Sequence, residues 1–326
     1  MQAVVLLQEE TMNSNAPMSV SVIVLTYKQP EVLDLIIQGL NLQTYGGDTE
    51  IIVSDDGSPE ITVAENIRAV NRCKYATKYV WHPDIGYRAA MARNNGIREA
   101  KNELLIFLDG DIVPCPGLIE KHVAHHRDSK QLVAGNRIWI GELKGSKSLT
   151  ELANIVPEPA AILHGEKENV LRNELLRSPH PWRACFSANL SVMKSSLVYF
   201  DERFVGWGPE DAELGYRLCV KYGFTPIYDE SIRAYHLESP DAVGNVFRKG
   251  GHEAIVNYIR NAFLFCDQCP GLDPEEIFFG FPRLKLDANT NVWKVIPRSD
   301  VGEFNLKALA QTARRWLESN NLQYPR

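Results

Sequence analysis

The stretch that decides the fold lies at residues 86–111 and reads GYRAAMARNNGIREAKNELLIFLDGD. Its first part, Ala89 to Ala100, has the composition of a helix. Its second part, Glu103 to Leu108, is a short apolar run of the kind found in strands that are buried on both faces. A helix followed by such a strand is the repeating unit of a parallel sheet covered by helices. The stretch therefore predicts an α/β fold.

The same alternation precedes this stretch. Strands are expected at Val20–Leu25, Glu50–Ser54 and Lys78–Trp81, with helices at Glu31–Gln43 and Pro59–Ala69 between them. This order predicts a doubly wound, mostly parallel sheet. The chain has neither G-x-G-x-x-G after its first strand nor G-x-x-x-x-G-K-[ST], which argues against a dinucleotide-binding fold and a P-loop.

The regular pattern fades in the second half of the chain. Residues 140–182 have no clear period and are expected to form a mobile loop or lid. A helix is expected at Glu210–Tyr222, and strands near Thr225–Tyr228 and Ile232–Tyr235. Further helices are expected at 252–265 and 306–318.

Composition limits the class of protein. The 326 residues carry a net charge of −6, which argues against a nucleic-acid partner. No stretch approaches the roughly 20 apolar residues of a membrane span, and the N-terminus lacks the basic flank of a signal peptide. The six cysteines are scattered, as expected for reduced thiols, and the pair Cys266 and Cys269 is interpreted as plain thiols. A cytoplasmic protein is expected.

Polar residues follow the predicted strands directly. They are Thr26-Tyr27, Asp55-Asp56 and Asp109-Gly110-Asp111. Ligands of open α/β sheets gather at the carboxyl ends of the strands. Tyr27 could stack on a nucleobase and Asp56 could accept a hydrogen bond from uracil N3–H, although a turn aspartate is an equal alternative for the Asp55-Asp56 cluster.

Oxygen and imidazole donors point to a divalent cation. Asp109 and Asp111 place two carboxylates on one turn, and His236 follows a later strand. Mn²⁺ accepts oxygen ligands together with an imidazole, so these residues are candidate ligands.

The segment FVGWGPED at residues 204–211 places two carboxylates at the start of a helix, beside a tryptophan. Asp211 or Glu210 could remove a proton from a sugar hydroxyl stacked on Trp207. The alternative is that acidic residues in a first helical turn only satisfy free N–H groups.

Several basic and histidine residues are open to two interpretations. Arg88 opens the helix 89–100 and could reach a phosphate, whereas Arg93 and Arg98 on that helix could be ordinary solvated residues. His122, His125 and His126 have a spacing that could bind a metal, but a solvated helix face is favoured.

Four motifs in this order resemble family 2 glycosyltransferases of GT-A fold, with the greatest likeness to enzymes of the bacterial chondroitin polymerase type and to the galactosyltransferase C-terminal region. The motifs are VSVIVLTYKQ at 20–29, IIVSDDGS at 51–58, residues 86–111 and FVGWGPEDAELGYRL at 204–218, and AYHLESP at 234–240 adds to them.

The resemblance implies a division of the chain and a role for each part. Residues 1–17 would be a flexible segment, and 18–240 a GT-A domain with a nucleotide-binding half at 18–137 and an acceptor-binding half at 183–240. Residues 241–326 would be a helical C-terminal extension.

The resemblance also implies roles for single residues. Thr26, Tyr27, Asp56, Arg88 and Asp109 would bind the UDP-sugar donor, and Asp109, Asp111 and His236 would hold Mn²⁺ or Mg²⁺. Trp207 and Glu210 would bind the acceptor. Asp211 would be the base of an inverting transfer to a saccharide, glycolipid or peptide hydroxyl.

Three alternatives to this function are weighed. A retaining enzyme of the polypeptide N-acetylgalactosaminyltransferase type usually has Asn where Asp211 stands, and a nucleotidyltransferase would need a Gly-rich, Lys-bearing loop after the first strand. A non-catalytic nucleotide-sugar-binding protein would not need to keep the candidate site residues. The basic and aromatic residues of the C-terminal extension are compatible with a peripheral membrane or protein contact, but a solvated face is favoured.

Overall fold

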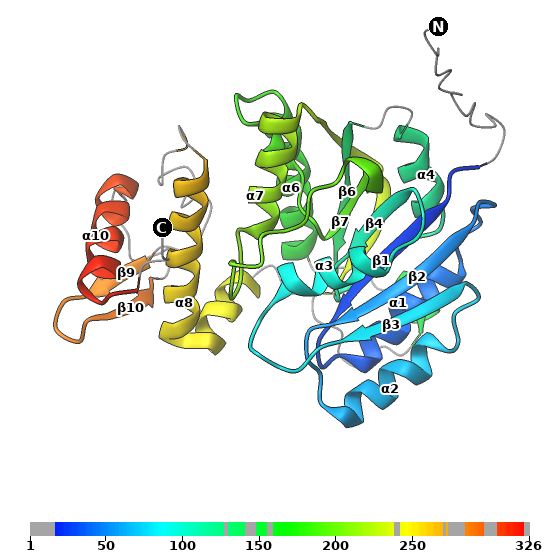
Figure 1. Cartoon of the computed structure of the whole chain (residues 1–326), viewed down its shortest axis with the longest axis horizontal. Coiled ribbons are helices and arrows are strands. Elements are labelled where there is room, and N and C mark those ends of the chain that lie inside the picture. Colours follow the sequence, from blue (N-terminus) through cyan, green and yellow to red (C-terminus); the bar gives the residue numbers. More distant parts are fainter. Residues whose placement is uncertain are drawn as a thin grey trace, which may run out of the picture.

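The computed structural model describes residues 17–126, 130–140, 148–154, 159–237, 242–269, 272, 284–296 and 305–322. An eight-stranded sheet with strand order β3-β2-β1-β4-β7-β6-β8-β5 dominates it. Helices flank this sheet, and a smaller C-terminal unit lies to one side (Figure 1). The expected α/β fold is confirmed.

One half of the sheet is parallel and contains the first four strands. These strands are β1 (Val20–Thr26), β2 (Thr49–Asp55), β3 (Ala76–Trp81) and β4 (Leu104–Leu108). The helices between them are α1 (Pro30–Asn41), α2 (Glu60–Val70) and α3 (Ala89–Glu99). Every strand and helix expected in this half is present.

The two faces of β1 belong to different core clusters. Val22 and Val24 pack in the cluster that contains Leu33 of α1, whereas Ile23 packs in the cluster that contains Ile97 of α3. Since neighbouring strand residues point to opposite faces, α1 and α3 cover opposite sides of the sheet. The doubly wound arrangement is therefore confirmed.

The other half of the sheet mixes strand directions. Its strands are β5 (Ile112–Pro114), β6 (Gln131–Trp139), β7 (Asn189–Met193) and β8 (Thr225–His236). β7 runs antiparallel to both β4 and β6, while β8 pairs parallel with β6 and antiparallel with β5. In this register His236 lies between Ile112 of β5 and Trp139 of β6.

The expectation of a mobile loop over residues 140–182 is wrong for most of the described part. This region contains α5 (Leu149–Ala153), α6 (Pro159–Leu176) and the 3₁₀ turn η1 (Pro181–Ala184). The buried face of α6 carries Glu168 and Arg172, while Leu163 and Val170 are about half exposed. Because of this reversed pattern, the spacing of apolar residues did not predict the helix.

The expectation of a solvated helix face is also wrong for two of the three histidines, His122 and His126. Helix α4 (Leu118–His125) turns His122 toward β7, and both His122 and His126 are buried. Nε2 of His122 lies 2.9 Å from Asn189 Oδ1, and Nε2 of His126 lies 2.7 Å from Ser191 Oγ. The histidines are buried because they hydrogen-bond polar side chains of β7.

The C-terminal part has its own core. It contains α8 (Ala242–Gln268), the antiparallel pair β9 (Leu284–Asp287) and β10 (Val292–Val295), and α10 (Leu306–Ser319). Tyr258, Trp293 and Trp316 are buried together there. Both expected helices are present, and the two-stranded sheet between them was not anticipated.

Two shorter elements precede this part and complete the fold. They are η2 (Lys194–Ser196) and helix α7 (Glu210–Tyr216), which continues as the π-helical turn η3 (Arg217–Lys221). Together α7 and η3 match the helix expected at 210–222. The six cysteines are free thiols, and no described helix is long and apolar enough to cross a membrane.

Candidate active site

The polar ends of the parallel strands lie close together, as expected. Thr26 is in register with Asp55, and the Asp56 N–H donates to the Thr26 carbonyl at 3.0 Å. A Cβ on Gly110 would lie 2.9 Å from the Leu25 carbonyl oxygen, so glycine lets the 109–111 turn approach the end of β1. The donor candidates of β1, β2 and β4 therefore share one edge of the sheet.

The two aspartates at the end of β2 have different surroundings. Asp55 is fully buried and accepts hydrogen bonds from the Ser58 N–H at 2.8 Å and from the hydroxyl of Tyr79. It therefore has the role of a turn residue. Asp56 accepts the Arg88 N–H at 2.8 Å through Oδ2, while its Oδ1 lies 3.2 Å from His82 Nε2. Burial raises the pKa of Asp56 to about 6.

Tyr27 directly follows β1 at this edge of the sheet and is partly exposed. Its ring is 38% exposed, and its hydroxyl donates to Asp84 at 2.9 Å. The ammonium of Lys28 lies over the ring and also pairs with Asp84. An exposed ring fixed at its hydroxyl end has one face available for stacking a base.

Asp111, directly before β5, and His236, the last residue of β8, come together. Nε2 of His236 lies 3.1 Å from Asp111 Oδ2, and the imidazole is nearly buried. Burial opposes ionisation of Asp111, but His236 outweighs it and holds the Asp111 pKa below its ordinary value. One carboxylate and one imidazole in contact are a donor set that suits Mn²⁺.

Asp109, the third expected metal ligand, is engaged elsewhere. Its Oδ1 accepts Nη2 of Arg93 at 2.8 Å, and Nη1 of the same guanidinium donates to Glu210 Oε1 at 2.7 Å. Within the described ranges, no group of three or more His, Cys, Asp or Glu side chains could hold a metal ion. The residues present fit a cation whose remaining ligands come from a bound diphosphate.

Arg93 was not among the predicted site residues, because the sequence left open whether it was an ordinary solvated arginine. Its side chain is only 3% exposed and bridges two carboxylates from distant segments. The spacing of Ala90, Arg93 and Ile97 was the signal that could have revealed it, because residues three and four apart share a helix face. Ala90 and Ile97 both lie in the core cluster beneath the sheet.

Glu210 and Asp211 begin helix α7, as expected. Burial raises the pKa of both carboxyls above their ordinary values, against the opposing charge of Arg93. The dipole of α7 favours the ionised form of Asp211, whereas burial favours the protonated form. A carboxylate with a raised pKa is a stronger base.

The segment before β7 connects Asp211 with the 109–111 turn. The Ser187 N–H donates to Asp211 Oδ2 at 3.4 Å, and the carbonyl of the next residue, Ala188, accepts the Asp109 N–H at 3.2 Å. The Ser187 hydroxyl is buried and makes no hydrogen bond with the described residues. These contacts place Asp211 at the edge of the sheet where the donor candidates lie.

Trp207 and its loop rest on helix α8. The Trp207 ring lies 6.0 Å from the ring of Tyr258. Asn261 donates to the carbonyls of Val205 and Gly208 at 3.0 and 2.7 Å. The C-terminal part therefore supports the loop that carries the predicted acceptor residues.

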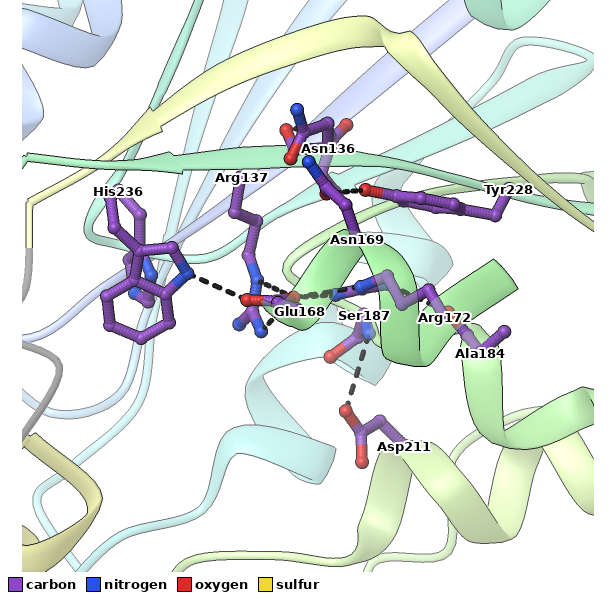
Figure 2. A network of polar contacts seen from close by, with 12 residues as sticks. Asn136, Arg137, Glu168, Asn169, Arg172, Ala184, Ser187, Asp211, Tyr228 and His236 are labelled. Atoms are coloured by element: carbon purple, nitrogen blue, oxygen red, sulfur yellow. Dashed lines mark hydrogen bonds and ion pairs between the residues drawn. The ribbon is translucent and has the colours of Figure 1, made fainter. Parts of the chain in front are cut away.

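A network of buried charges extends from helix α6 to His236 (Figure 2). Glu168 accepts hydrogen bonds from Arg137 at 2.6 Å, from Arg172 at 2.6 Å and from the indole N–H of Trp139 at 2.7 Å. The Trp139 ring lies edge-on to the His236 imidazole, 4.0 Å between centroids. Sequence reasoning missed this network because Glu168 lies in the region expected to be a loop.

The site thus brings together one carboxylate–imidazole pair, Asp111 with His236, and two carboxyls at the start of α7. The model of glycosyl transferase family 2 matches residues 21–195, more than half of the chain. The chain therefore belongs to this family of sugar-transferring enzymes, and the resemblance seen in the motifs is confirmed.

Relatives and a solved structure agree with this assignment. The chain is 33% identical over 284 residues to a validoxylamine A glucosyltransferase of Streptomyces hygroscopicus subsp. jinggangensis, covering 80% of this chain and 63% of the relative. It is 31% identical over 261 residues to a hyaluronan synthase of Pasteurella multocida, covering 74% of this chain and 26% of the relative. The chain thus spans less than two thirds of either relative.

The fold also matches a mannosyltransferase from Pyrobaculum calidifontis in complex with GDP-Man and Mn²⁺. The TM-score is 0.54 at 15% identity, covering 96% of this chain and 77% of the other. This similarity confirms a GT-A-like fold.

Proposed function

We propose that this protein is an inverting, metal-dependent glycosyltransferase that moves a sugar from a UDP-sugar to a hydroxyl acceptor. The observation that carries the proposal is the position of Asp211. Two independent connections tie it to the Asp109–Asp111 turn: the Ser187–Ala188 segment and the Arg93 bridge to the neighbouring Glu210. A base thereby lies beside the group predicted to bind the diphosphate.

The uridine is bound at the ends of β1 and β2. Tyr27 stacks on the base, and Asp56 accepts its N3–H through Oδ1, an oxygen that accepts no hydrogen bond from the described residues. Thr26 is buried beside them with a hydroxyl that also makes no hydrogen bond there. Arg88 contributes its backbone N–H to Asp56 and so fixes the carboxylate.

The diphosphate lies over the 109–111 turn. Asp111 and His236 would hold Mn²⁺ or Mg²⁺ there, with Asp109 as a further candidate ligand. When bound, the cation would neutralise charge on the departing diphosphate.

Sugar transfer needs a base and a hydroxyl group, held in a fixed position, that receives the sugar. Asp211 removes the hydroxyl proton while the acceptor oxygen bonds to the anomeric carbon. The bond from that carbon to the diphosphate oxygen breaks, and UDP leaves with the electron pair. Attack from the face opposite the leaving group inverts the anomeric configuration. Glu210 and Trp207 orient the acceptor.

The chemical class of the molecule that receives the sugar is inferred from the relatives of this chain. Relatives named as hyaluronan and chondroitin synthases, such as the one from Escherichia coli at 30% identity, favour a saccharide. Glycolipid and peptide hydroxyls are the other candidates.

The test is UDP release from a panel of UDP-sugars, with Mn²⁺ and with excess chelator. Release that depends on Mn²⁺ and is abolished by Asp111→Ala, in a protein with an unchanged thermal midpoint, is expected. NMR of the product should show inverted anomeric configuration. Full turnover in chelator would exclude the metal dependence, and a retained configuration would favour the retaining alternative.

A further inference from the structure

Two guanidinium groups share one carboxylate beside the site. Glu168 of α6 pairs with both Arg137 and Arg172, which leaves one positive charge on the cluster. The side chain of Arg172 is 2% exposed and also donates to the Ala184 carbonyl at 2.7 Å. The side chain of Arg137 is 17% exposed. The remaining charge is therefore accessible at Arg137.

The position of Arg137 on β6 directs this charge to the candidate cation site. Arg137 and Trp139 are two residues apart on one strand, so they share a face, and the guanidinium lies 5.4 Å from the centre of the Trp139 ring. That ring contacts His236, which in turn contacts Asp111. Figure 2 shows the same order of side chains, from His236 through Arg137 to Glu168.

We propose that Arg137 contacts the diphosphate of the sugar donor and that Glu168 is the positioning residue that holds its guanidinium for this contact. The inference rests on the proposed function and assigns to β6 and α6 a part in binding the leaving group. Arginine suits this role because its planar fork binds phosphate oxygens through two N–H groups. A donor placed where charge develops on the leaving group also favours the transition state.

Helix α6 has a specific part in this proposal. Glu168 accepts both Nε and Nη2 of Arg137, at 3.1 and 2.6 Å, so those two groups are committed, whereas Glu168 does not engage Nη1. The indole of Trp139 occupies the other Glu168 oxygen. This arrangement fixes Arg137 before the donor binds, which reduces the entropy lost on binding.

The experiment compares ligands that differ only in phosphates. Uridine, UMP and UDP are titrated by calorimetry against wild type, Arg137→Gln, Arg137→Lys and Glu168→Gln, in chelator and again in Mn²⁺. Arg72→Gln is the control. Arg72 is an exposed arginine that pairs with Asp34 of helix α1, away from the candidate site.

Arg137→Gln is expected to weaken UDP binding roughly ten- to a hundredfold, the effect of losing a charge-assisted hydrogen bond, and to leave uridine binding unchanged. The loss should appear in chelator as well as in Mn²⁺. Arg137→Lys and Glu168→Gln should lose less, and Arg72→Gln nothing. Should the Gln variant fail to fold, the Lys variant carries the test, because it keeps the charge and loses only the fork.

Three outcomes would overturn the inference. UDP binding by Arg137→Gln that equals wild type would exclude the contact. A loss that appears only with Mn²⁺ would show that Arg137 acts through Asp111 rather than on the diphosphate. Wild-type protein that binds neither uridine nor UDP would instead refute the proposed function on which the inference rests.

Discussion

The two halves of the central sheet build their parts of the site in different ways. The parallel half supplies residues that directly follow a strand, such as Asp56 after β2 and Asp109 after β4. The half with mixed strand directions supplies residues from within its strands, such as Arg137 and Trp139 of β6, and completes them with Glu168 of α6. In the first half the site residues can be located because they directly follow strands. In the second half they can be located only from the way the strands pair.

The halves also differ in how their charges are held. Asp55 accepts a backbone N–H and the side chains of Asn66 and Tyr79, and Asp56 accepts a backbone N–H, but Glu168 holds two guanidinium groups at once. Arg93 connects the halves, because it pairs with Asp109 after β4 and with Glu210 of α7. We infer that the parallel half selects the base of the nucleotide, and that the other half contacts the diphosphate and supplies the proton acceptor.

The largest expected effect separates these two tasks at Asp211. Asp211→Asn keeps the shape of the side chain but removes the base, so sugar transfer should fall by roughly 10²- to 10⁴-fold. UDP affinity should stay within twofold of wild type, since none of the residues proposed to bind UDP is changed. Initial rates and calorimetric UDP binding measure the two quantities.

Asp34→Asn is the matched control, because Asp34 is a carboxylate of α1 paired with Arg72, remote from the strand ends. It should change neither quantity. Normal transfer by Asp211→Asn would show that Asp211 is not the base, and an equal loss of UDP binding would refute the division of tasks.

A second variant removes the connection between the halves. Arg93→Gln leaves Asp109 and the buried Glu210 without their guanidinium. Loss of one partner of a buried ion pair typically costs about 3–5 kcal/mol of unfolding free energy. Urea unfolding of wild type and variant at neutral pH measures the difference.

Arg98→Gln is its control on the same helix, since Arg98 forms an exposed pair with Glu202 and should cost about 1 kcal/mol or less. A loss from Arg93→Gln as small as that from Arg98→Gln would mean that the bridge contributes little to joining the halves.

The same contrast explains which features the sequence could predict. Asp56, Asp109 and Asp111 follow apolar strands directly, so local pattern located them. Asp111 and His236 are 125 positions apart and meet only because β5 pairs with β8. They were expected to meet because both are metal-ligand types that follow predicted strands, and the family resemblance supported this; no local signal showed that β5 pairs with β8.

The features that the sequence did not reveal depend on tertiary context. Helix α6 was missed because its buried face is charged and its apolar residues face outward, the reverse of the usual pattern. Arg93 was judged by its charge, which is normally solvated, although its helical spacing matched the core. Buried charge is stable only beside its partners, and those partners come from distant segments.

A smaller effect tests base selection by the parallel half. Burial raises the pKa of Asp56 to about 6. Because only the ionised carboxylate can accept the uracil N3–H through either oxygen, UDP affinity should fall as pH drops through about 6. Asp56→Asn should bind UDP roughly tenfold more weakly at pH 7.5 and lose the pH dependence.

Competition by UDP, GDP and ADP, measured from pH 5.5 to 8, provides the data. Asp55→Asn is the comparison, because Asp55 holds the turn and its change should lower stability while the preference for UDP remains. Equal binding of the three nucleotides by wild type would show that Asp56 does not select uracil.

The smallest expected effect concerns the stability of the half with mixed strand directions. Burial against β7 lowers the pKa of His122 to about 4 and that of His126 to about 3. Above pH 6.5 both histidines are neutral in the folded and unfolded chains, so they add no pH dependence. As pH falls below 6.5 the unfolded chain takes up protons first, and stability is lost until the folded histidines also titrate near pH 4. Each histidine should therefore lower the free energy of unfolding by about 0.8 kcal/mol at pH 6 relative to pH 7.5.

His122→Gln keeps a side chain that can hydrogen-bond Asn189 but cannot titrate, so it should remove the His122 share of this loss of stability in acid. Urea midpoints of wild type and His122→Gln at pH 7.5 and pH 6 measure it, with His125→Gln, whose ring pairs with Asp229 at the surface of the same helix, as the comparison. An acid loss that is the same in wild type and His122→Gln would mean that the buried histidine is not what makes this half sensitive to acid.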